Sequence, residues 1–379
     1  MNPEDENKAP RERAQPVYQD PAQPYGRPRP DRPGLYSAQP LSPGQQQKAA
    51  RSFLRSAGNR AALMPILLNL LAILLLFPAM LVWLLSSMNT FLPYYEQGGV
   101  PAIVRQVTAQ TGTIFALALL CTVLGVACAI LIARPVLGRK IFGGWKRPAW
   151  TASGFAKGLV LAFGISAGGE LLNMGMEALS RATGLKLNAP DFSPTVNGPA
   201  DILMLAYVCV LGPLMEETLF RGMILPSLRP WGDRLAVVVS AAMFALAHMN
   251  LVQGIPAFFL GLLFARMTLS AGSVVPSALT HILYNSLSMA LLAGGINSNR
   301  TLQAAYIVFL AAAAAGSVVL LVLRRVDFRK AAPPDVSPAP AAEHPYRVVL
   351  LQSAAFWVAV ALFAVFSFAV TGAAVTPGF

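Results

Sequence analysis

Three short groups of ionisable and amide side chains lie within stretches of the chain that are otherwise apolar. Gly212-Pro213-Leu214-Met215-Glu216-Glu217-Thr218-Leu219-Phe220-Arg221-Gly222 holds two adjacent acids and a base. Phe244-Ala245-Leu246-Ala247-His248 ends a second stretch, and His281-Ile282-Leu283-Tyr284-Asn285 lies in a third. Acid, imidazole and amide groups together can move protons and stabilise a developing negative charge. The candidate site residues are therefore Glu216, Glu217, Arg221, His248, His281 and Asn285.

The spacing of these residues predicts which of them share a helix face. Glu217 and Arg221 are four residues apart, so their side chains can pair, and His281 and Asn285 have the same spacing. Glu216 points about 100° away from its neighbour and is free to face another helix. If the stretches are helical, Glu216 lies roughly 20 Å from Arg229 and His248 about as far from Arg234, and Asn285 lies at a similar distance from Gly272.

The elements that carry these residues are predicted to be membrane-spanning helices. Of the 379 residues, 55% are hydrophobic and only 12% are charged, which is far more apolar than a soluble domain. An uncharged stretch of about 20 residues is long enough to cross the hydrocarbon core as a helix. We expect an all-α, polytopic bundle of about nine transmembrane helices, near residues 61–87, 113–133, 153–178, 199–225, 234–249, 252–270, 273–293, 303–323 and 348–371.

Charge distribution predicts the orientation of the bundle. The net charge is +12, but the basic residues are divided among the loops and do not form one face, so nucleic acid is not an expected partner. Ten lysines and arginines precede residue 61, and five more lie between 134 and 147. Because cytosolic loops are enriched in these residues, we expect a cytosolic N-terminus and an external C-terminus.

Composition divides the chain into five predicted parts. Residues 1–60 hold ten prolines and no periodic apolar pattern, which predicts a disordered cytosolic tail that could bind a partner domain. An N-terminal transmembrane helix pair is expected over 61–150, and the helices with the candidate site over 151–323. A Pro-rich cytosolic linker over 324–347 and an accessory transmembrane helix over 348–379 complete the chain.

The motifs E-E-x-x-x-R, F-x-x-x-H and H-x-x-x-N, in this order within about 70 residues, resemble those of the CPBP family of CAAX proteases and bacteriocin-processing or immunity proteins. The resemblance extends over roughly residues 150–295. It implies a glutamate-dependent intramembrane endopeptidase, resembling type II CAAX prenyl endopeptidases, that acts on a membrane-associated peptide or protein. By resemblance, Glu216 and His248 would activate water and His281 and Asn285 would stabilise the oxyanion, with Glu217 and Arg221 orienting the site.

Other functions remain open from the sequence. Two histidines and a glutamate match the number of ligands in a catalytic zinc site, but H-E-x-x-H is absent and the resemblance implies no cofactor. A non-catalytic scaffold or bacteriocin-immunity protein would keep the motifs without the reaction. A transporter could use Glu170 with Glu216 and Arg221 as an ion path, but no inverted repeat is visible. We expect a multi-pass protein of a bacterial plasma membrane.

Overall fold

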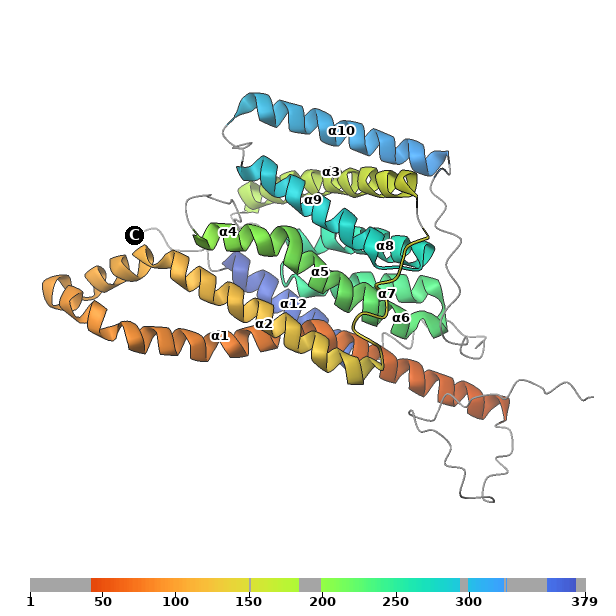
Figure 1. Cartoon of the computed structure of the whole chain (residues 1–379), viewed down its shortest axis with the longest axis horizontal. Coiled ribbons are helices and arrows are strands. Elements are labelled where there is room, and N and C mark those ends of the chain that lie inside the picture. Colours follow the sequence, from red (N-terminus) through yellow and green to blue (C-terminus); the bar gives the residue numbers. More distant parts are fainter. Residues whose placement is uncertain are drawn as a thin grey trace, which may run out of the picture.

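The computed structural model describes residues 42–149, 151–183, 199–293, 299–323, 325 and 353–372, and all regular structure within these ranges is helical (Figure 1). The expected all-α class is therefore confirmed. The α-helices are α1 (Pro43–Ala109), α2 (Thr111–Leu137), α3 (Ala152–Thr183), α4 (Pro199–Ala206), α5 (Gly212–Glu216), α6 (Leu225–Leu228), α7 (Asp233–Ala247), α8 (Leu251–Ala271), α9 (Val275–Ala293), α10 (Arg300–Val322) and α12 (Ala354–Gly372).

Six helical segments among the described residues are long and apolar enough to cross a membrane. They are Arg51–Val107, Gly112–Leu137, Ala152–Thr183, Asp201–Trp231, Leu251–Ala271 and Arg300–Val322. Each of the nine expected segments contains helix among its described residues, but α7, with 15 residues, α9, with 19, and α12 are not among these six. The expected tail between 1 and 41 and most of the expected linker, with His344, lie outside the described residues.

The first helix starts earlier than the sequence pattern predicted, so the assignment of residues 43–60 to a disordered tail is wrong. Ser42 and Gln45 form a capping box: the Gln45 amide N–H donates to Ser42 Oγ at 3.4 Å, and Ser42 N–H donates to Gln45 Oε1 at 3.0 Å. Pro43 occupies the first helical position, where its missing N–H is harmless. Good helix-forming residues follow, and Leu54 is fully buried. The prolines of the tail all precede or begin this helix.

The segment from Pro199 to Trp231 is an almost continuous helical rod with two π-helical interruptions. Tyr207–Leu211 and Glu217–Ile224 are the π-helices, and they lie on either side of α5. Each π-turn changes the hydrogen-bonding register, and such turns are frequent at functional sites. The candidate acids at 216 and 217 therefore lie where α-helix changes to π-helix.

The bundle has a buried centre and an exposed periphery. Leu219, Phe220, Val237 and Phe244 belong to the main buried cluster, which joins the second π-helix to α7. Helix α8 packs against α7 and α3, and α9 packs against α8. In Figure 1, α10 forms one edge beside α3, whereas α1 and α2 run antiparallel along the opposite edge. Helix α12 packs against α1.

Candidate active site

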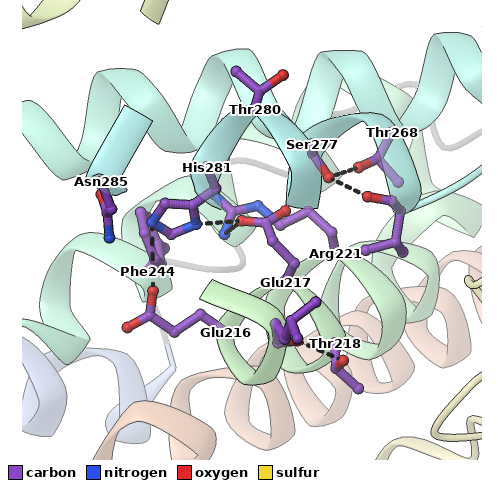
Figure 2. A network of polar contacts seen from close by, with 12 residues as sticks. Glu216, Glu217, Thr218, Arg221, Phe244, Thr268, Ser277, Thr280, His281 and Asn285 are labelled. Atoms are coloured by element: carbon purple, nitrogen blue, oxygen red, sulfur yellow. Dashed lines mark hydrogen bonds and ion pairs between the residues drawn. The ribbon is translucent and has the colours of Figure 1, made fainter. Parts of the chain in front are cut away.

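The two adjacent glutamates lie in different environments. Glu217 is fully buried, whereas about a quarter of the Glu216 side chain, 26%, is exposed. The sequence predicted that they diverge, because neighbouring helical residues point about 100° apart. Figure 2 shows both carboxylates below α9, with Glu217 facing inward toward Arg221 and Glu216 on the other side of the His281 ring. One carboxylate is therefore structural in position and the other is accessible.

Glu217 and Arg221 form the ion pair that their spacing predicted. Arg221 Nη1 lies 2.9 Å from Glu217 Oε1, and both side chains are completely buried. The pair is close but poorly directed, since no guanidinium N–H points at an acceptor within the described part of the chain. Aromatic rings compensate: the Arg221 Cζ atom lies 4.2 Å from the centre of the Phe244 ring and 5.4 Å from that of Phe264. Cation–π contact stabilises a desolvated guanidinium in such a position.

His281 lies between the two acids and contacts both. Its Nδ1 atom is 3.2 Å from Glu217 Oε1, and its Nε2 atom is 3.8 Å from Glu216 Oε2. A carboxylate can only accept, so Nδ1 carries a hydrogen that it donates to Glu217. This contact fixes the plane of the imidazole and directs Nε2 toward the more accessible acid. The buried ion pair thus orients a histidine (Figure 2).

Asn285 shares a helix face with His281 but has a different partner. Its Nδ2 atom donates to the backbone carbonyl of Val208 at 2.9 Å. Val208 belongs to the first π-helix, so this bond attaches α9 to the interruption that precedes Glu216. The structure therefore holds the Asn285 amide one helical turn from His281, with its orientation set by a neighbouring backbone (Figure 2).

His248 is fixed by its own helix at the end of α7. Its Nδ1 atom lies 2.9 Å from the Phe244 carbonyl oxygen, which can only accept, so Nδ1 carries a hydrogen and Nε2 is the free ring nitrogen. Within the described residues His248 forms no hydrogen bond or ion pair with Glu216. The Phe244 ring connects the groups instead, because it is perpendicular to the rings of His248 and His281, with centroids 4.9 and 5.8 Å away.

Phe244 is thus more central than its sequence position indicated. Its ring contacts both candidate histidines and the Arg221 guanidinium. Sequence reasoning missed Phe264, whose ring is 4.9 Å from His281 at an interplanar angle of 30°. A phenylalanine in an apolar helix gives no signal that separates it from one facing lipid. Only the packing of α8 against α9 identifies it.

The two histidines and the glutamate match the number of ligands in a catalytic zinc site. Among the residues that the structure describes, no group of three His, Cys, Asp or Glu side chains is arranged to hold a metal ion. The Nδ1 atoms of His248 and His281 are both engaged in protein contacts. Cys121, Cys128 and Cys209 are free thiols, the first two in α2 and the third in the first π-helix.

Comparison with known protein families matches residues 198–287 to the family described as Rce1-like, type II CAAX prenyl endopeptidase Rce1-like. The match covers the rod with both glutamates, the α7–α8 hairpin and most of α9, which is less than a quarter of the chain. Comparisons with curated proteins and with solved structures gave no match. All six candidate site residues fall within the matched segment. The resemblance is therefore confirmed for residues 198–287, which are similar to the Rce1-like, type II CAAX prenyl endopeptidase family.

Proposed function

We propose that this protein is an intramembrane endopeptidase that hydrolyses a peptide bond with water activated by Glu216 and His248. The observation that carries the proposal is the asymmetry of the two acids. Glu217 is buried and occupied by Arg221 and His281, whereas Glu216 is partly exposed and faces His281 Nε2 at 3.8 Å. An accessible carboxylate beside positioned donors is the arrangement that general-base hydrolysis needs.

In the proposed reaction, Glu216 takes a proton from water as the water oxygen attacks the carbonyl carbon of the substrate peptide. The free Nε2 of His248 accepts a hydrogen bond from that water and orients it. Negative charge then develops on the carbonyl oxygen, which His281 and Asn285 stabilise. His281 must carry hydrogens on both ring nitrogens to donate to this oxygen, and it lies between two carboxylates that suit such an imidazolium. Collapse of the intermediate returns the proton to the leaving amine.

The substrate is a membrane-associated peptide or protein, and no cofactor is needed. The reacting groups are all supplied by side chains of α5, of α9 and of the residue that directly follows α7, and the second π-helix supplies the ion pair that orients them. The alternative, a scaffold or immunity protein, would need the same packing but not the accessible Glu216. If the protein is a scaffold or immunity protein, substitution of Glu216 would leave its function unchanged.

We further propose a cytosolic N-terminus and a multi-pass arrangement in a bacterial plasma membrane. The start of α3 and the end of α10 lie on one side, because Lys157 Nζ donates to the Arg325 carbonyl at 3.0 Å. Helix α7 would extend only about 22 Å, less than the hydrocarbon thickness of roughly 30 Å. The turn that follows it therefore keeps His248 within the membrane. Cysteine labelling of the single variants Lys48→Cys and Arg300→Cys in sealed vesicles would test this orientation. The cysteine at position 48 should be protected from external reagent, and the cysteine at position 300 should react.

The test of activity compares peptide termini in membranes of cells that produce wild-type protein, Glu216→Gln or His248→Ala. We expect a substrate terminus that appears with wild type and falls by about 10²- to 10⁴-fold in either variant, the usual contribution of general acid–base groups. Glu177→Gln is the matched control, because this acid is largely exposed on α3. Equal termini in all four samples, at equal protein levels, would overturn the peptidase and favour the scaffold.

A further inference from the structure

A polar contact from the first helix reaches the turn that carries His248. Asn69 lies in the apolar part of α1, far outside the family segment of residues 198–287. Its side-chain nitrogen donates to the Ala247 carbonyl at 3.1 Å and to the Pro65 carbonyl at 3.0 Å. Both amide hydrogens are thus used, one within α1 and one across the helix interface. The second bond ends one residue before His248.

This acceptor is one that α7 cannot satisfy by itself. The last four carbonyls of a helix lack intrahelical donors, and Ala247 is the final residue of α7. A carbonyl without a partner is costly in a membrane, where water is scarce. Asn69 therefore provides a C-terminal cap for α7 from another helix.

The turn that follows is held in an uncommon backbone conformation. Met249 has φ of 51°, the one positive φ at a non-glycine residue among the described residues. Such a conformation persists when the surrounding structure imposes it, and it is found frequently at functional sites. On the far side, Asn250 caps α8 by accepting from the Gln253 N–H at 3.1 Å. The turn is thus clamped before and after Met249.

The position of Asn69 is itself well defined. Met64 and Leu68, on the same helix, are buried in the cluster that contains Phe244. Helix α2 approaches α1 closely at Gly125, where a Cβ atom would lie 2.7 Å from the Ala72 backbone nitrogen. Helix α1 cannot slide along the bundle without opening these contacts. These contacts therefore fix the position of the Asn69 amide relative to the end of α7.

We infer that Asn69 is a positioning residue for His248, and that α1 is part of the catalytic unit although it lies outside the family segment. The His248 ring is attached to the Phe244 carbonyl, and its backbone follows directly after the carbonyl that Asn69 binds. Loss of the Asn69 donor would let the end of α7 relax and turn Nε2 away from the water that it orients. This inference rests on the proposed peptidase function.

The experiment compares wild type with Asn69→Leu, which keeps the side-chain size but removes the amide, and with Asn69→Gln, which restores a donor. Thr122→Val is the matched control, because Thr122 in α2 donates only within its own helix, to Ala118 at 2.9 Å. Cleavage of the identified substrate gives kcat and KM. Protein in micelles with isotope-labelled histidine gives the ring resonances of His248 and His281 by NMR. The chain has only three histidines to assign.

We expect Asn69→Leu to lower kcat by about 10- to 100-fold, comparable to the loss of other supporting contacts, with little change in KM. The His248 ring resonances should move while those of His281 stay, Asn69→Gln should recover part of kcat, and Thr122→Val should resemble wild type.

Unchanged kcat and unchanged His248 resonances in Asn69→Leu would overturn the inference. Equal movement of both histidines with loss of thermal stability would also overturn it, in favour of a general packing role. If the resonances move selectively but wild type cleaves nothing, the positioning of the turn is supported and the peptidase function fails.

Discussion

Helices α8 and α1 are both apolar enough to cross a membrane, yet their surroundings are opposite. In the most apolar 18-residue stretch of α8, 61% of the residues are buried inside the protein. In the most apolar 18-residue stretch of α1, only 6% are buried. Phe264 of α8 packs on His281 and Arg221, whereas Phe77 of α1 is 76% exposed. The same residue type thus supports a polar site in one helix and meets the membrane in the other. An apolar sequence alone does not distinguish these two roles. They are distinguished by the side chains that each phenylalanine contacts.

The largest expected difference between centre and periphery concerns two Glu–Arg pairs of identical spacing. Arg221→Ala should lower the free energy of unfolding by about 3–5 kcal/mol, because it removes the guanidinium from a fully buried Glu217 carboxylate. Arg181→Ala should lower it by less than about 1 kcal/mol, since Arg181 and Glu177 are 75% and 70% exposed. Unfolding in detergent micelles measures both. The double variant Glu217→Gln/Arg221→Met should recover part of the loss, and equal effects at 221 and 181 would contradict the comparison.

A smaller effect is expected for two glycines of α3. A Cβ atom on Gly164 would lie 2.8 Å from Ser317 Cβ on α10, whereas one on Gly168 would meet nothing within 4 Å. Gly164→Ala should therefore destabilise the protein by about 1–3 kcal/mol through overpacking. Gly168→Ala should be neutral or stabilising by up to about 1 kcal/mol, because alanine favours helix. Thermal unfolding of the two variants tests the contact between α3 and α10, which a stable Gly164→Ala would contradict.

The smallest effects are expected at two asparagine caps. Asn250 caps the central α8, and Asn299 caps the peripheral α10 by accepting from Thr301 and Leu302 at 3.0 and 3.2 Å. Each alanine substitution should cost about 1 kcal/mol of stability. Only Asn250→Ala should also reduce cleavage, because Asn250 belongs to the turn with His248. Hydrogen exchange at the start of each helix measures the loss of the cap, and a cleavage assay on the same variants measures activity. Loss of activity in Asn299→Ala would contradict the prediction that only the cap of α8 affects cleavage.

The pairing of Glu217 with Arg221 could be predicted from the sequence because it depends on spacing within one helix. The all-helical fold was predictable for a similar reason, since apolar stretches of membrane length allow few alternatives. It was not predictable which acid would be buried, because this depends on Phe244 and Phe264 from other helices. The partner of Asn285 depends on a π-turn at Val208, where the residues would equally suit an α-helix. The start of α1 was missed because proline content was averaged over 60 residues, although Ser42 and Gln45 mark the boundary.

Helix α1 begins well before it reaches the packed part of the bundle. Residues 43–52 extend past the other helices before Leu54 is buried, as Figure 1 shows at the red end of the chain. Ten helical residues cover about 15 Å. The first turns of α1 therefore form a stiff helical extension that separates the start of this helix from the packed part of the bundle.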